Sequence, residues 1–143
     1  MREQYENIRR AGGDLFVVFP SDTALVQEFM EAFGPLPFPV YTDPGRELYY
    51  DMGHVTMPKL KMLALVGAGA LSGRLGPFLP KEETQRQVVM KSMKTQDVYI
   101  QGGTWIFDTS LQPIWRHIDP SPDKHASPEK IAEVFRQHVF AGR

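Results

Sequence analysis

The stretch Ile100-Gln101-Gly102-Gly103-Thr104-Trp105-Ile106-Phe107-Asp108, continued by Leu111–His117, decides the fold of this chain. Two short apolar runs flank the turn residues 108–110. β-Branched and aromatic residues bounded by turn formers are typical of paired strands, so we expect a β-hairpin. A helical pattern begins at Ser127, which is placed to cap a helix whose first residue is a proline. The last third of the chain is therefore predicted to be a hairpin followed by a closing helix.

Upstream of the hairpin, helical and strand patterns alternate along the chain. Leu15–Phe19 is a continuous apolar run, typical of a strand buried on both faces in a parallel sheet. The other predicted elements are a helix over residues 2–11, a helix over Thr23–Phe33 capped by Ser21 or Asp22, a short edge strand at Phe38–Tyr41, a short helix started by Asp43-Pro44-Gly45, a helix over Met57–Leu71 and an amphipathic helix over Lys81–Met93. This alternation predicts an α/β fold with a parallel portion and an antiparallel edge.

Composition narrows the classes of function. The 143 residues suit one domain spanning 1–143, and their net charge of −1 argues against a nucleic-acid partner. The longest apolar run, Met62–Leu71, is too short to cross a bilayer, and the N-terminal residues show no signal peptide. We therefore expect a cytoplasmic protein with no membrane partner. The sequence contains no cysteine, which removes thiolate nucleophiles and thiolate metal ligands.

Four segments of the sequence form a pattern when they are taken in order. They are Asp14–Pro20, Phe38–Pro44 with Arg46–Tyr49, Gln101–Thr104, and His117 and Asp119 with Ala126 and Ser127. Their order and spacing resemble those of the peroxiredoxin-like proteins of the AhpC/TSA group. Within that group the sequence is most similar to the branch that includes the peroxiredoxin-like 2 and prostamide synthase-type proteins. The resemblance implies a thioredoxin-like three-layer α/β fold with a mixed sheet.

The departures from the family pattern bear on function. Members of the family begin with a strand and with a helix that carries Cys-x-x-Cys at its N-terminus, where the helix dipole stabilises a thiolate. This sequence resembles the family only from inside that helix onward, so we expect the usual first strand and both cysteines to be absent. The missing strand would lie between Leu15–Phe19 and Thr104–Phe107. We expect these two strands to pair directly, or a partner subunit to fill the gap as a homodimer through exposed strand edges.

The candidate catalytic residues lie near the end of the second hairpin strand. His117 and Asp119 fall on one face of an extended strand, where a carboxylate can orient a histidine as a general base. The alternative is a surface ion pair at a strand end. Tyr50 and His54 are supporting candidates, and their alternative is a half-buried helix face. His125 could join the His-Asp pair, but such loose spacing does not predict a metal, and we expect none.

The candidate ligand-binding residues surround the glycine turn. The resemblance places Gly102, Gly103 and Thr104 in the loop that faces the active centre of thioredoxin-like folds. Two glycines let backbone amides approach a ligand closely, although a bulge or tight strand entry explains them equally well. Trp105, Asp43 and Tyr49 complete the predicted set. Packing is the alternative role for Trp105, and helix capping is the alternative for Asp43.

Three functions remain open from the sequence. In the first, a thioredoxin-like protein without thiol redox activity binds a small apolar molecule. It would catalyse a cofactor-free acid/base step there, such as an isomerisation, cyclisation or dehydration, as an isomerase, cyclase or lyase. In the second, the chain is a non-catalytic dimeric interaction module. In the third, it is an inactive fragment of an AhpC/TSA-like thiol peroxidase or reductase.

Overall fold

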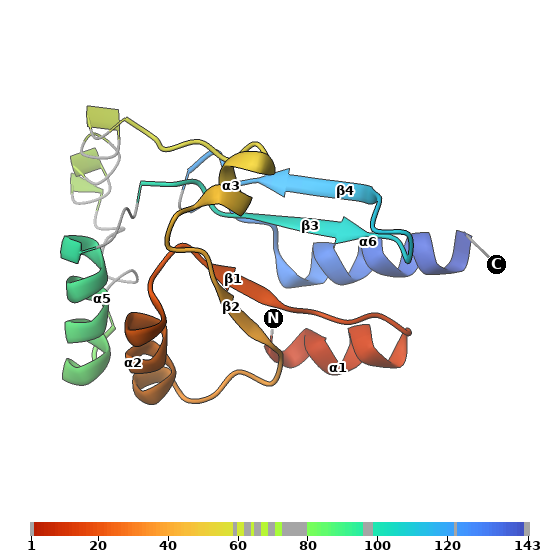
Figure 1. The fold of residues 1–143 in the computed structure, drawn as a ribbon, viewed down its shortest axis with the longest axis horizontal. Helices are drawn as coiled ribbons and strands as arrows, with labels where there is room; N and C mark the ends of the chain where they lie inside the picture. The colour runs from red at the N-terminus through yellow and green to blue at the C-terminus, as the bar shows by residue number, and fades with distance from the viewer. Residues whose placement is uncertain are drawn as a thin grey trace. The chain divides into compact units, whose positions relative to one another are not determined.

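The structure is a computed structural model that describes residues 2–58, 60–61, 64, 67–68, 71–72, 80–95, 99–121 and 123–141. The described elements are, in order, α1 (Arg2–Arg10), β1 (Val17–Phe19), α2 (Thr23–Phe33), β2 (Val40–Thr42), α3 (Glu47–Asp51), α5 (Glu83–Thr95), β3 (Gly103–Phe107), β4 (Pro113–Ile118) and α6 (Pro128–Ala141) (Figure 1). The predicted alternation of helices and strands is confirmed. None of the helices within these ranges is long and apolar enough to cross a bilayer.

The chain divides into two compact units. The first unit comprises residues 1–17, 36–40 and 101–143, and the second comprises residues 18–35 and 41–100. The first unit holds the hairpin and the two terminal helices. The second holds α2, α3 and α5. Each unit is described in turn.

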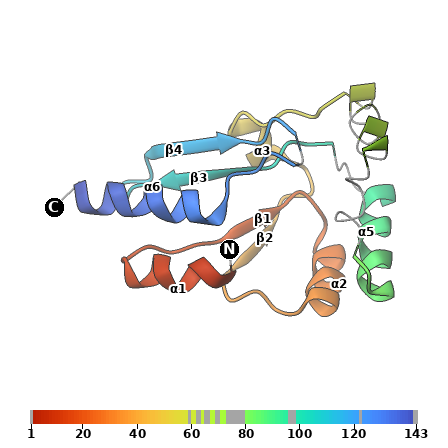
Figure 2. The same cartoon turned by 180° about the vertical axis from the view of Figure 1, so that it is seen from behind.

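In the first unit, the predicted hairpin packs against α6 (Figures 1 and 2). β3 and β4 are antiparallel, with Thr104 opposite His117 and Ile106 opposite Trp115. Ile106 is buried and forms a core cluster with Ile131 and Val134 of α6. A two-stranded hairpin is marginal in water without a packed face, so α6 stabilises it by covering that face.

α1 joins the same unit through its apolar side. Tyr5 and Ile8, three residues apart on one helix face, are both buried. The ring of Tyr5 meets the ring of Phe38 edge-on at 5.5 Å. Gly13 lies against the ring of Phe135 on α6, and a Cβ at this position would overlap that ring. Gly13 therefore allows the chain after α1 to approach α6 closely.

In the second unit, α2 and α5 lie side by side (Figure 2). The predicted cap is confirmed, since the Asp22 carboxylate accepts a hydrogen bond from the Leu25 backbone N–H at 2.9 Å. The Gln85 side-chain amide donates to the Ala32 carbonyl at 3.2 Å, which ties the start of α5 to the end of α2. The two helices are therefore antiparallel.

β1 and β2 form a two-stranded sheet. The Val17 N–H donates to the Pro39 carbonyl at 3.0 Å, and the Asp43 N–H donates to the Phe19 carbonyl at 2.8 Å. Residue numbers rise together along both strands, so the pairing is parallel, as predicted.

The expected direct pairing of Leu15–Phe19 with Thr104–Phe107 is wrong. The described strands form two separate two-stranded sheets, β1–β2 and β3–β4. The mixed parallel and antiparallel character is present, but it is divided between these sheets. One physical reason lies on β1, where the Tyr49 hydroxyl donates to the Val18 carbonyl at 2.7 Å and occupies an acceptor that a further strand would use.

Of the helix predicted over Met57–Leu71, the described residues 60, 61, 64, 67, 68 and 71 are helical, whereas residues 57 and 58 are not, and the other residues of this range lie outside the described ones. At its predicted start, the Met57 N–H donates to the Tyr99 carbonyl at 2.8 Å, and Thr56 forms an antiparallel bridge with Ile100. Met57 therefore lies beside an extended bridge and not in a helix. It is apolar and buried, which suits an extended segment as well as a helix, so the apolar pattern predicts a helix start that is too early.

The hairpin turn is held by one side chain and contains one strained residue. The Asp108 carboxylate accepts hydrogen bonds from the Ser110 N–H at 2.8 Å and from the Gln112 N–H at 2.9 Å. Leu111 has a backbone φ of 61°, in the left-handed region, although its side chain is 79% exposed. A leucine at this position carries the cost of that conformation without the benefit of burial.

We expect Leu111→Gly to stabilise the protein. Relief of the left-handed conformation is worth roughly 1–2 kcal/mol, and the greater freedom of glycine in the unfolded chain offsets roughly 0.5–1 kcal/mol of it. Urea unfolding should therefore show a gain of up to about 1.5 kcal/mol. Leu111→Ala is the control, since it keeps the Cβ and should show no gain. Equal changes in the free energy of unfolding for the glycine and alanine variants would contradict this account.

Candidate functional site

The candidate site in the first unit is a polar corner where β4 leaves the hairpin. We call it the β4 corner and define it as Gln101, Gly102, His117, Asp119 and Lys124. The Asp119 N–H donates to the Gly102 carbonyl at 3.0 Å, which extends the hairpin ladder beyond the last residue of β4. The Gln101 side-chain amide donates to the Asp119 carbonyl at 3.1 Å. These bonds fix the backbone on both sides of the corner.

The structure brings His117 and Asp119 together. The His117 Nε2 lies 3.5 Å from Asp119 Oδ1, with the two side chains 35% and 16% exposed. The same Nε2 lies 2.9 Å from the Lys124 carbonyl oxygen. A carbonyl only accepts hydrogen bonds, so Nε2 is the donor and carries a proton. The imidazole thereby ties the end of β4 to the loop that leads into α6.

Gly102 makes room for the Asp119 carboxylate. A Cβ at position 102 would lie 2.8 Å from Asp119 Oδ2. A residue with a side chain at this position would push the carboxylate away. Of the two interpretations of the glycines, close approach therefore fits Gly102, and the group that approaches is a side chain of this chain.

The remaining predicted residues of the glycine turn lie on both faces of the hairpin. Thr104 is the register partner of His117, and Gly103 is opposite Ile118. Side chains alternate between the faces of a strand, so Trp105 projects from the face opposite to Thr104. There the Arg116 guanidinium lies 5.5 Å from the centre of the indole ring. Trp105 therefore does not share a face with His117.

The other predicted site residues lie in the second unit. Asp43 accepts hydrogen bonds through Oδ1 from the Glu47 N–H at 3.1 Å and through Oδ2 from the Tyr49 N–H at 3.2 Å, so its carboxylate holds the start of α3. His54 is buried, and its ring meets the Tyr49 ring edge-on at 5.2 Å. Tyr50 is exposed, and its hydroxyl lies 3.4 Å from Thr56 Oγ1. Asp43, Tyr49 and His54 therefore come together, whereas Tyr50 lies outside this group.

Tyr49 is the polar centre of that group. Its hydroxyl donates to the Val18 carbonyl at 2.7 Å. Burial raises the pKa of Tyr49 to about 12, and the negative charge of Asp43 adds to the rise. The phenol is thus held neutral and acts as a hydrogen-bond donor. Its position supports the backbone between β1 and α3.

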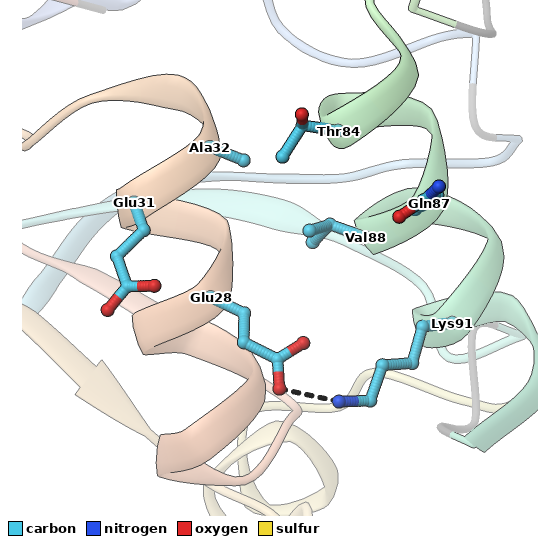
Figure 3. Close-up of a pocket in the computed structure, with 7 residues that line it drawn as sticks. All are labelled: Glu28, Glu31, Ala32, Thr84, Gln87, Val88 and Lys91. Atoms are coloured by element: carbon cyan, nitrogen blue, oxygen red, sulfur yellow. Dashed lines mark hydrogen bonds and ion pairs between the residues drawn. The ribbon is translucent and has the colours of Figure 1, made fainter.

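Two hollows among the described residues are lined by none of the residues of the β4 corner. One, of about 340 Å³, lies between α2 and α5 (Figure 3). The other holds only about 10 Å³ between α1 and α6. Within the described ranges, no group of three carboxylate or imidazole side chains is placed to hold a metal ion. His125 is exposed in the loop before α6.

The hollow between α2 and α5 was not predicted from the sequence. Its ion pair joins Glu28 to Lys91, two residues that are 63 positions apart. A polar pair on two amphipathic helices gives no local signal that the helices face each other. The one available hint was that Glu28 and Glu31 stand together beside the apolar stripe of α2.

Comparison with known families gives one match. The family model for the AhpC/TSA antioxidant enzymes matches residues 1–121, from the first helix to the residue pair that follows Asp119. No curated protein and no solved structure matches the chain. The match agrees with the mixture of helices and small sheets, and the predicted α/β thioredoxin-like fold class is confirmed. The narrower assignment to the peroxiredoxin-like 2 and prostamide synthase-type branch stays a prediction.

The raised pKa of Tyr49 predicts a distinct alkaline titration. The folded-state pKa lies above the ordinary value of 10.0, so the hydroxyl contributes stability that is fully present below pH 10 and is lost as the pH rises through about 12. Tyrosinate absorbance of the folded protein should show a late component with a midpoint near 12. Tyr49→Phe should remove that component, and Tyr50→Phe, at an exposed tyrosine, should leave it in place. A late component that survives Tyr49→Phe would contradict the assignment.

Proposed function

The chain belongs to the AhpC/TSA antioxidant enzyme family, and from that premise we propose that these residues act as a non-catalytic binding module. The family's thiol chemistry needs a cysteine, and the 143 residues contain none. The protein as described here is therefore a cysteine-less member with a thioredoxin-like fold. What it does must come from other side chains or from its surface.

The proposal rests on the hydrogen bonds that the side chains of the β4 corner already make within the chain. A general base needs an accessible nitrogen without a proton. His117 uses Nε2 to donate to the Lys124 carbonyl, and the Asp119 carboxylate fills the space over Gly102. Of the predicted acid/base pair, the His117 Nε2 is thus used to join the end of β4 to the loop before α6. The small apolar ligand of the catalytic hypothesis also lacks support, because neither hollow described above is lined by a residue of the β4 corner.

The partner that we propose is a second copy of the chain. No described side chain is less than 2% exposed, so the core is thinly covered. The second unit exposes four large apolar residues close together in the sequence, which are Tyr41, Leu48, Tyr50 and Val55 at 43–57% exposure. A net charge of −1 offers little electrostatic repulsion between copies. Burial of apolar surface in a homodimer would complete the cover of the core.

One observation favours a second candidate, proton transfer at the β4 corner. The His117 Nδ1 is not the atom bound to Lys124, and the ring is 35% exposed beside a carboxylate. A molecule that reached Nδ1 could exchange a proton there without breaking the bond to Lys124. Under this alternative, Asp119 would position the ring and stabilise its charged form. The reaction would be a cofactor-free isomerisation, cyclisation or dehydration.

Substitutions at His117 test the structural role. The amide nitrogen of glutamine can take the place of Nε2 and donate to the Lys124 carbonyl, whereas alanine cannot. We expect His117→Ala to lower the free energy of unfolding by about 0.5–1.5 kcal/mol and His117→Gln to restore most of it. His125→Ala, at an exposed histidine in the adjacent loop, is the control and should have no effect. Equal losses with alanine and glutamine would refute the structural role of the hydrogen bond.

Association of two copies predicts a stability that depends on concentration. Native mass spectrometry should show a dimer, and the melting temperature should rise with protein concentration. Tyr41→Ser should weaken the dimer, because it removes an exposed ring from β2. Leu111→Ser removes an exposed apolar side chain from the hairpin turn in the other unit and should leave the dimer intact. A monomer whose melting temperature does not change with concentration would rule out the proposed partner.

A further inference from the structure

The hollow between α2 and α5 has the size of a small ligand site. Its volume of about 340 Å³ falls at the lower end of the range found for ligand pockets. The residues that line it are Glu28, Glu31 and Ala32 on α2 and Thr84, Gln87, Val88 and Lys91 on α5. All belong to the second unit, so the hollow is formed within one compact body.

The charge of the hollow is negative. Glu28 and Glu31 each contribute a carboxylate, and Lys91 contributes one ammonium group, which gives a net charge of −1. The Lys91 Nζ lies 2.5 Å from Glu28 Oε1, so this pair is satisfied (Figure 3). Glu31 is exposed and has no ion-pair partner among the residues that the structure describes. One carboxylate on the rim is therefore available to a cation.

The interior of the hollow is apolar between these charges. Ala32 projects from α2 and Val88 projects from α5 toward each other, whereas Glu28 and Lys91 meet beside them and the Glu31 carboxylate lies farther out on α2 (Figure 3). The side chain of Lys91 shows what such a site accommodates. Its aliphatic stem extends from α5 across the gap, and its ammonium reaches a carboxylate on α2. Long amines place their methylene groups on apolar surface in this way and keep the charged head at a polar group.

We propose that this hollow binds an alkylammonium group, the chemistry shared by a free aliphatic amine and a lysine side chain on another polypeptide. The ammonium pairs with Glu31, and the methylene stem lies on Ala32 and Val88. Thr84 and Gln87 supply oxygen acceptors at the rim for the remaining N–H donors. This binding is independent of the dimer and of the β4 corner, because its residues are shared with neither.

The test is a titration of the ¹⁵N-labelled protein with n-pentylamine, followed by amide chemical shifts. We expect saturable shifts confined to the facing parts of α2 and α5. Pentanoate has the same stem and the opposite charge, and it should produce no such shifts. Glu31→Gln should weaken pentylamine binding about fivefold, as expected for the loss of one exposed ion pair. Glu82→Gln, at an exposed glutamate outside the hollow, is the matched control and should leave the affinity unchanged.

A second arm identifies the source of the amine. The blocked tripeptide acetyl-Gly-Lys-Gly-amide presents the same stem and ammonium on a polypeptide. Binding of the tripeptide at least as tight as that of pentylamine supports a lysine on a protein partner, whereas binding of pentylamine alone supports a free amine. The proposal is overturned if pentylamine produces no saturable shifts, if pentanoate shifts the same amides, or if Glu31→Gln and Glu82→Gln bind alike.

Discussion

The burial of Ile106 against Ile131 and Val134 is the contact on which the first unit depends. A hairpin of two strands cannot bury enough surface to stand alone, and α6 supplies the apolar face that it lacks. The loop from β4 leads into α6, and His117 ties the end of β4 to this loop by donating to the Lys124 carbonyl. A polar contact thus supplements the apolar contact that holds the hairpin on α6.

In the second unit, hydrogen bonds from polar side chains hold neighbouring elements together. The Asp43 carboxylate gathers the backbone N–H groups at the start of α3, and Tyr49 on that helix donates to the Val18 carbonyl of β1. The half-buried Tyr49 hydroxyl, with its raised pKa, remains a donor over the whole physiological range. Residues that carry the family resemblance therefore have a structural task in this chain. Their presence in the sequence does not require that any thiol chemistry be retained.

These contacts distinguish closed regions, whose polar groups are already hydrogen-bonded within the chain, from open regions, where apolar or charged side chains are exposed. The β4 corner is the more closed of these regions, because the His117 imidazole donates to the Lys124 carbonyl and the Gln101 side-chain amide donates to the Asp119 carbonyl. The surface around β2 and α3 is open, with apolar side chains in water, and the hollow between α2 and α5 keeps one carboxylate without a partner among the described residues. Binding energy comes from groups that are not yet satisfied. A binding role on the open surfaces is therefore more consistent with the physics than chemistry in the closed corner.

The sequence by itself determined the local elements and the lineage. Apolar periodicity and capping residues placed α2 at Thr23–Phe33, and the runs around Asp108 placed the hairpin, because these signals arise from contacts between near neighbours in the chain. It also paired His117 with Asp119, since strand alternation sets the direction of both side chains. Tertiary structure alone decided that the Lys124 carbonyl accepts a hydrogen bond from His117, that the Val18 carbonyl accepts one from Tyr49, and that Glu28 forms an ion pair with Lys91. Each of these contacts joins residues whose encounter depends on how whole elements pack, and no local pattern records that packing.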